Sequence, residues 1–169
     1  MIVVVMGVSG CGKTTVGRAL AAALGWPFFD GDDFHPEANV ARMAAGVALT
    51  DDDRWPWLDR IAAEMRAVQA DGGNAVLACS ALRQSYRDRL AAAGDVRFVH
   101  LVGDADTIGA RLAARRHRYM PATLLASQFA TLEAPPDAIT VDVRDDLDSQ
   151  VAAILTRLAP AVRAAAAAP

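Results

Sequence analysis

The most informative chemistry in the sequence lies in a glycine-rich loop near its start. The loop fits the phosphate-binding pattern G-x-x-x-x-G-K-[ST], and it lies between an apolar run and a helical pattern, as that pattern requires. Its glycines let backbone N–H groups wrap around phosphate oxygens, and the following helix adds the positive end of its dipole. The loop therefore predicts binding of a nucleoside triphosphate. The expected nucleotide-binding residues are Gly7, Val8, Ser9, Gly10, Cys11, Gly12, Lys13, Thr14 and Thr15.

Lys13 is the only lysine of the chain, whose other 16 basic residues are all arginine. A lysine at this position is a compact point charge that reaches between the β- and γ-phosphates, so we expect it to be catalytic. Thr14 would offer its hydroxyl to Mg²⁺. Cys11 occupies a variable position of the pattern, and we interpret it as a small filler residue.

Two carboxylates, Asp30 and Asp32, follow the second apolar run of the chain. Ligands of open α/β sheets bind at the carboxyl ends of the strands, so both acids are expected near the phosphate loop. The third apolar run ends in Cys79-Ser80, without the carboxylate with which many P-loop ATPases hold Mg²⁺. We expect Asp30 to hold an Mg²⁺-bound water and Asp32, on the same side of an extended segment, to be the general base. The reverse assignment and a merely solvated acidic turn stay open.

Three arginines that follow the second and third apolar runs could meet at the same edge of a sheet: Arg54, Arg83 and Arg87. The planar guanidinium group suits a carboxylate. His35 could exchange hydrogen bonds with hydroxyl groups, or it could be a structural loop residue. Together these residue types could bind an acceptor with a carboxylate and several hydroxyls. The acids at 51–53 are interpreted as the start of a helix, where the dipole favours negative charge.

The scaffold for these groups follows from the alternation of short apolar runs with helical patterns. This alternation predicts parallel βαβ units and hence a three-layer α/β sandwich with a five-stranded parallel sheet. The expected strands cover residues 2–6, 26–30, 74–79, 96–102 and 138–143. The expected helices cover residues 16–24, 37–45, 54–70 with Asp53 as the cap, 82–93, 104–116, 122–132 and 147–158.

Composition excludes several classes of protein. The chain has 169 residues and a net charge of −3, which argues against a nucleic-acid binder and against a polybasic membrane-surface protein. Its two cysteines form no disulfide framework or metal-binding spacing. The N-terminal apolar run is too short for a signal peptide, and no apolar stretch reaches the roughly 18 residues of a membrane span. We expect a cytoplasmic protein with one domain, residues 1–160, and a frayed alanine-rich tail, residues 161–169.

Several longer motifs are far rarer than a phosphate loop. They are Met6 to Gly10, Asp30-Gly31-Asp32 with His35-Pro36, Asn39 with Met43 to Gly46, Leu49 to Leu58, Cys79 to Arg83 with Tyr86-Arg87-Asp88, and Ser127 to Pro135. Over roughly residues 1–143, the chain thereby resembles the gluconate kinase family of small P-loop kinases. The resemblance implies phosphorylation of D-gluconate at its terminal hydroxyl, with ATP and Mg²⁺, to 6-phospho-D-gluconate. It also implies a substrate contact by Gln128 and an association into homodimers.

The resemblance further implies a lid, at about residues 111–135, that closes over the bound phosphates. Arg111 and Arg115 lie one helical turn apart and share a face, and Arg115 is expected to meet the transferring phosphoryl group. An ordinary charged helix end is the alternative interpretation. The family usually shows Gly-His where this chain has His117-Arg118, a departure that could alter closure of the lid or choice of acceptor.

Two other functions stay open. One is a different small-acceptor kinase of the same fold, such as a shikimate or adenylylsulfate kinase, and the other is a non-catalytic nucleotide-binding regulator. The carboxylate pair and the arginines favour an enzyme, because a sensor needs no base beside the γ-phosphate.

Overall fold

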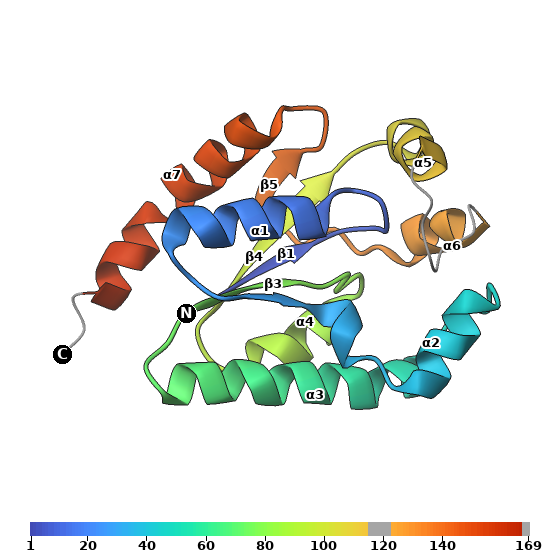
Figure 1. Cartoon of the computed structure of the whole chain (residues 1–169), viewed down its shortest axis with the longest axis horizontal. Helices are drawn as coiled ribbons and strands as arrows, with labels where there is room; N and C mark the ends of the chain where they lie inside the picture. Colours follow the sequence, from blue (N-terminus) through green and yellow to red (C-terminus); the bar gives the residue numbers. More distant parts are fainter. Residues whose placement is uncertain (115–122, 167–169) are drawn as a thin grey trace.

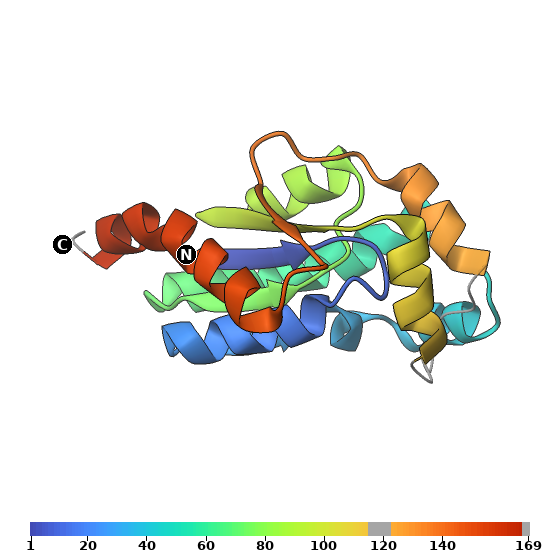
Figure 2. The same ribbon diagram turned by 90° about the horizontal axis from the view of Figure 1, so that it is seen from above.

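The computed structural model describes residues 1–114 and 123–166, which form a parallel sheet with helices on both faces (Figures 1 and 2). The strands are β1 (Ile2–Met6), β2 (Phe28–Asp30), β3 (Ala75–Ala78), β4 (Val96–Val102) and β5 (Ile139–Asp142). The helices are α1 (Lys13–Leu24), the short 3₁₀ turn η1 (Gly31–Phe34), α2 (Glu37–Ala44), α3 (Asp51–Ala70), α4 (Gln84–Ala91), α5 (Ala105–Ala114), α6 (Thr123–Thr131) and α7 (Leu147–Ala166). The predicted three-layer α/β sandwich is confirmed.

The sheet has the strand order β2-β3-β1-β4-β5, and every neighbouring pair is parallel. From β1 the chain builds the β3 side of the sheet first and the β4 side afterwards. The order of the strands therefore changes direction at β1, and open α/β sheets bind ligands in the crevice outside such a point. The loop between β1 and α1 lies at this position.

The residues of β1 divide the core into two layers because successive side chains of a strand point to opposite faces. Val3 and Val5 belong to the layer with α1 and α7. Ile2, Val4 and Met6 belong to the layer with α3 and α4. Figure 1 shows the same division, with α1 and α7 above the sheet and α3 and α4 below it. All of β1 is buried, which explains why its sequence is apolar throughout rather than alternating.

Helix α3 begins at Asp51, earlier than predicted, and the prediction that Asp53 is its cap is wrong. Thr50 is the N-cap: its hydroxyl accepts a hydrogen bond from the Asp53 N–H at 3.3 Å. The Asp53 carboxylate in turn accepts from the Thr50 N–H at 2.8 Å. This reciprocal pair satisfies two N–H groups that the start of a helix leaves without partners.

Other boundaries also differ from the sequence-based ranges. Helix α1 begins at Lys13 rather than at residue 16, so both Lys13 and Thr14 belong to its first turn. Helix α4 begins at Gln84, and strands β2, β3 and β5 are slightly shorter than expected. Helix α7 continues past Pro160 to Ala166, so most of the predicted tail belongs to the last helix.

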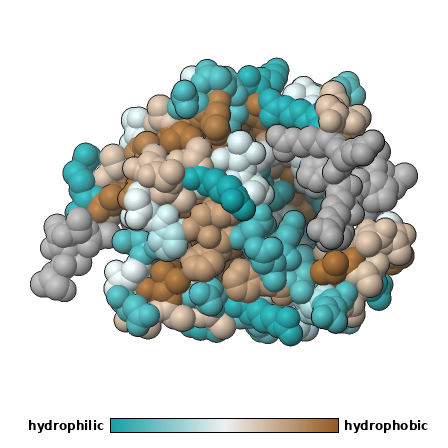
Figure 3. All heavy atoms as spheres, viewed as in Figure 1, coloured by the Kyte–Doolittle hydropathy of each residue, from teal (hydrophilic) through white to brown (hydrophobic). Residues whose placement is uncertain are grey.

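The surface carries hydrophilic and hydrophobic residues side by side over the face shown in Figure 3. The exposed large apolar side chains of the described residues, Val47, Val102 and Leu147, come from three separate segments of the chain. Within residues 1–114 and 123–166, each helix is too short or too polar to serve as a membrane span.

Candidate active site

The phosphate loop takes the conformation that its sequence predicts. Gly10 and Gly12 have φ angles of 80° and 106°, a left-handed region that side chains with a Cβ rarely adopt. Gly12 is the N-cap of α1 and accepts a hydrogen bond from the Val16 N–H at 2.9 Å. Lys13 turns back over the loop, and its ammonium group donates to the Val8 carbonyl at 3.0 Å. The loop thus presents backbone N–H groups and one cation at the amino end of a helix.

Two oxygen-bearing side chains meet beside the loop, at the end of β2. The Thr14 hydroxyl donates to one carboxylate oxygen of Asp30 at 2.9 Å, and the other carboxylate oxygen accepts from the Asp32 N–H at 3.2 Å. A hydroxyl and a carboxylate are the hard oxygen donors that Mg²⁺ prefers, and they fit such an ion here. The described residues contain no cluster of three His, Cys, Asp or Glu that could hold a metal ion. An ion at Thr14 and Asp30 would therefore complete its shell with phosphate oxygens and water.

The expectation that Asp30 and Asp32 share one side of an extended segment is wrong. Asp30 ends β2 and is the N-cap of η1, so the chain turns immediately after it. The turn separates the two acids: Asp30 faces Thr14, whereas Asp32 lines a cavity. A one-residue gap predicts a common face only where the backbone stays extended, and η1 ends that regularity.

A cavity of about 400 Å³, which we call the main cavity, opens beside the phosphate loop. It brings together six of the predicted site residues, from five parts of the chain: the loop, η1, α3, α6 and the segment before α2. These are Ser9, Lys13, Asp32, His35, Arg54 and Gln128. Its further described lining consists of Asp33, Val40, Met43, Val47, Ala48, Leu49, Trp57, Ser80, Leu82, Tyr86 and Ser127.

His35 lies at the wall of the main cavity, stacked on the indole ring of Trp57. Their ring centroids are 4.2 Å apart and their planes differ by 13°. The His35 side chain is 5% exposed, and its Nε2 lies 4.0 Å from a carboxylate oxygen of Asp32. Burial, with a smaller contribution from the charge of Arg54, lowers the pKa of His35 to about 4. The imidazole is therefore neutral near pH 7.

Trp57 was not predicted as a site residue, and its polar contact was missed. The buried Trp57 indole N–H donates to the Gly31 carbonyl at 2.7 Å. Gly31 lies between Asp30 and Asp32, and a Cβ on it would approach the Ala78 carbonyl to 2.7 Å. Trp57 therefore fixes the turn that carries both acids. The signal in the sequence was a tryptophan directly after Pro56 in a polar segment, which is too general to assign this contact.

A chain of polar contacts joins α3 to α4 at another wall of the main cavity. Arg54 donates from Nη1 to the Tyr86 hydroxyl at 3.1 Å, and that hydroxyl donates to a carboxylate oxygen of Asp51. The other carboxylate oxygen of Asp51 accepts from Arg83 at 2.7 Å. Arg83 lies outside the described lining of the cavity, so the structure brings it to Arg54 only through Asp51 and Tyr86. Neither Asp51 nor Tyr86 was predicted as a site residue.

Arg87 lies outside the described lining of the main cavity, so its role in substrate binding stays a prediction. The residue is only 2% exposed, and it donates to the carbonyls of Ala81 and Leu82 at 3.0 and 3.1 Å and to Gln84 at 2.8 Å. Burial lowers the pKa of its guanidinium. Ala81 has a φ angle of 43°, an unusual conformation for a residue with a Cβ. Arg87 thus holds the strained segment that follows β3.

The expected lid region is described in part. Arg111 lies in the last turn of α5 and donates from Nη2 to the carbonyl of Val143, directly after β5. Gln128 of α6 accepts from the Ser9 N–H of the phosphate loop at 2.7 Å. The prediction for Arg115 and the His117-Arg118 departure lie outside the described residues.

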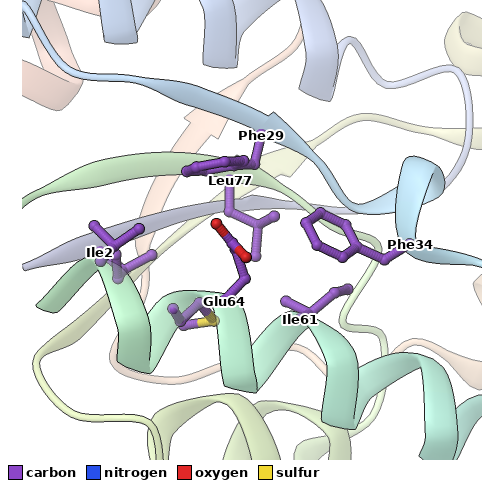
Figure 4. Close-up of a pocket in the computed structure, with 8 residues that line it drawn as sticks. Ile2, Phe29, Phe34, Ile61, Glu64 and Leu77 are labelled. Atoms are coloured by element: carbon purple, nitrogen blue, oxygen red, sulfur yellow. The ribbon is translucent and has the colours of Figure 1, made fainter. Parts of the chain in front are cut away.

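A second, smaller pocket lies between the sheet and α3 (Figure 4). Its walls are mainly apolar, and the Glu64 side chain points from α3 toward Leu77 and Phe29. Its volume of about 10 Å³ holds about one water molecule, so it is too small to be a substrate site.

Comparison with known proteins identifies the family of this chain. The family model described as shikimate kinase matches residues 9–133. The gluconokinase of Gluconobacter oxydans (strain 621H) is 50% identical over 137 residues, which cover 79% of this chain and 76% of the relative. A probable gluconokinase of Xenopus tropicalis is 41% identical, over 94% of this chain and 91% of the relative. The crystal structure of a gluconokinase from Sinorhizobium meliloti 1021 has a TM-score of 0.85 and 42% identity, and covers 94% of this chain and 91% of that one. Because it shares a phosphate loop, a parallel sheet and 41 to 50% sequence identity with these relatives, the chain belongs to the gluconokinase family of P-loop kinases.

Proposed function

We propose that the protein transfers the γ-phosphoryl group of ATP to the terminal hydroxyl of D-gluconate, in the presence of Mg²⁺, and releases ADP and 6-phospho-D-gluconate. The observation that carries the proposal is the main cavity, which joins a phosphate-loop lysine, a carboxylate and an arginine in one space. A kinase acting on a sugar acid needs these three groups: one for the phosphates, one for the hydroxyl proton and one for the carboxylate.

On the donor side, the loop from Gly7 to Thr15 binds the phosphates through its N–H groups. Lys13 releases the Val8 carbonyl and neutralises the charge that develops on the transferring group. Thr14 and Asp30 would hold Mg²⁺. The ion would supply charge neutralisation at the phosphate oxygens.

On the acceptor side, Asp32 accepts the proton of the attacking hydroxyl as the new O–P bond forms and the bond to ADP breaks. The neutral His35 beside it contributes a hydrogen bond to a sugar hydroxyl or to Asp32. Arg54 binds the carboxylate at the other end of the acceptor. Gln128 gives one more polar contact. The assignment of Asp32 rather than Asp30 as the base is supported by its position in the cavity lining.

Arg111 and Arg115 complete the proposal as the cations of a lid that meets the transferring group after closure. A cytoplasmic location, where ATP is available, and the homodimer that the family resemblance implies are also part of it. Light scattering of the purified protein would measure the oligomeric state.

The test is an assay of ADP release with purified enzyme, ATP, Mg²⁺ and a panel of acceptors. We expect turnover with D-gluconate, and a product whose phosphate lies on the terminal oxygen by ³¹P–¹H NMR. Turnover with shikimate or adenylyl sulfate but not with gluconate would contradict the substrate assignment. Nucleotide binding without turnover of any acceptor would favour a regulator.

A further inference from the structure

The contact chain from Arg54 to Arg83 contains more groups than binding of a carboxylate requires. Two guanidinium groups lie over the same Tyr86 ring, with distances of 5.6 and 6.0 Å from their central carbons to the ring centroid. Both also approach the carboxylate of Asp51, at 3.6 Å for Arg54 and 2.7 Å for Arg83. Only Arg54 and Tyr86 of these four line the main cavity.

The charges of this cluster suit an anion. Two arginines and one aspartate leave one positive charge, because Tyr86 is neutral. Burial, together with the hydrogen bond to Asp51, raises the pKa of Tyr86, so its hydroxyl keeps its proton at neutral pH. That hydroxyl can therefore accept from Arg54 and donate to Asp51 at the same time. A substrate carboxylate at Arg54 would balance the remaining charge.

Tyr86 is well suited to fix the position of another side chain. It is 2% exposed, it belongs to α4, and its ring packs edge-on against Trp55 of α3 at 5.6 Å. The described hydrogen bond and ion pair of Arg54 both involve Nη1, which leaves other N–H groups of the guanidinium for a ligand. A long side chain that is held in this way loses its rotational freedom before the substrate arrives, and such preorganisation improves binding.

We propose that Tyr86 and Asp51 are positioning residues that hold the Arg54 guanidinium in place for the carboxylate of the acceptor, with Arg83 anchoring Asp51 from behind. The inference rests on the proposed function, since it concerns recognition of the sugar acid. The junction of α3 and α4 thereby selects acidic over neutral acceptors.

The experiment compares Tyr86→Phe, Asp51→Asn and the matched control Asp52→Asn. Asp52 lies in the same first turn of α3 and is exposed, so its substitution removes the same charge from the helix start. We expect Tyr86→Phe to raise KM for gluconate about tenfold, which corresponds to about 1.4 kcal/mol. Asp51→Asn should raise it several-fold. KM for ATP and kcat should stay within about twofold in both variants, and Asp52→Asn should match the wild type.

A double-mutant cycle separates positioning from a general structural effect. In the background of Arg54→Gln, the substitution Tyr86→Phe should no longer raise KM for gluconate, because the group that it positions is gone. A tenfold rise that persists in this background would overturn the proposal, as would a Tyr86→Phe enzyme with unchanged KM for gluconate. If circular dichroism shows that Tyr86→Phe does not fold, the cycle is measured with Asp51→Asn in its place. Asp52→Asn is then the control in both backgrounds.

Failure of the proposed function would look different. It would appear already in the wild type, as absence of gluconate turnover, and would overturn both proposals. A wild-type enzyme that phosphorylates gluconate while the variants keep its KM would overturn the positioning role alone.

Discussion

The phosphate loop and the main cavity face each other but are built in different ways. The loop comes from nine consecutive residues and offers mainly backbone N–H groups, which lie at the junction of β1 and α1. Beyond the loop itself, the main cavity takes side chains from η1, α2, α3, α4 and α6, which are separate elements of the chain. The donor side is therefore a local structure, whereas the acceptor side depends on how separate elements pack. Substitutions should consequently act differently on the two sides.

The largest effect is expected on the donor side, at Lys13. Lys13→Met should lower kcat by about 10³-fold, because the phosphate loop loses the cation that it places against the phosphates. The melting temperature should stay within a few degrees, since among the described residues the hydrogen bond of the ammonium group is the one to Val8. Steady-state kinetics and calorimetry measure the two quantities. An unchanged kcat would remove Lys13 from the reaction.

Asp32→Asn should have the second largest effect. Its kcat should decrease by about 10²- to 10³-fold, because the general base is lost. The affinity for ATP should change far less, because Asp32 belongs to the acceptor side. Titration calorimetry with a non-hydrolysable ATP analogue gives the affinity. A variant that fails only in nucleotide binding would contradict the division of the site.

Trp57→Phe tests whether the packing of α3 positions the acids. Phenylalanine keeps the stacking on His35 but loses the hydrogen bond to Gly31, at a cost of about 1 kcal/mol in stability. We expect kcat to fall about tenfold, with KM for ATP nearly unchanged. Trp26→Phe, which alters a tryptophan in the other layer of the core, is the control. Equal kcat values for the two variants would show that Trp57 only packs.

The smallest effect concerns pH. Because the pKa of His35 is about 4 in the folded protein and about 6.5 when unfolded, the unfolded state takes up the proton first. Stability from this group is complete above pH 6.5 and is lost as the pH falls toward 4, by at most about 1 kcal/mol per pH unit. Melting temperatures of wild type and His35→Gln should therefore converge over this window. Parallel curves would mean that His35 titrates normally.

The conformation of the phosphate loop could be predicted almost completely from the sequence, because a contiguous motif fixes its own geometry. The acceptor side could be predicted only in part. Arg83 and Arg87 are four residues apart, a spacing that predicts a common helix face. Arg83, however, is the N-cap residue of α4, outside the helix, and its side chain reaches Asp51, while Arg87 turns inward to backbone carbonyls. Such directions depend on where a helix begins, which the sequence defines least well.

The helices and strands of the fold, too, could be predicted only where a local pattern defines their ends. Strand β4 matches its predicted range because an apolar run between clear breaks defines it. The start of α3 was missed because Thr50 and Asp53 form a capping box with aspartate instead of the usual glutamate or glutamine. Tyr86 and Trp57 have apolar rings whose single polar atoms carry their roles. Their contacts appear only when α3 and α4 are placed together.

The hydrogen bond between Ser9 and Gln128 has a consequence for the order of events in a turnover. An amide hydrogen makes one strong hydrogen bond at a time, so a phosphate oxygen that takes the Ser9 N–H must displace the Gln128 side chain. Gln128 thereby competes with the nucleotide. The displaced Gln128 side chain still lines the main cavity, where a hydroxyl-rich molecule can contact its amide. By thermodynamic reciprocity, a molecule that binds the released amide also favours nucleotide binding at the loop.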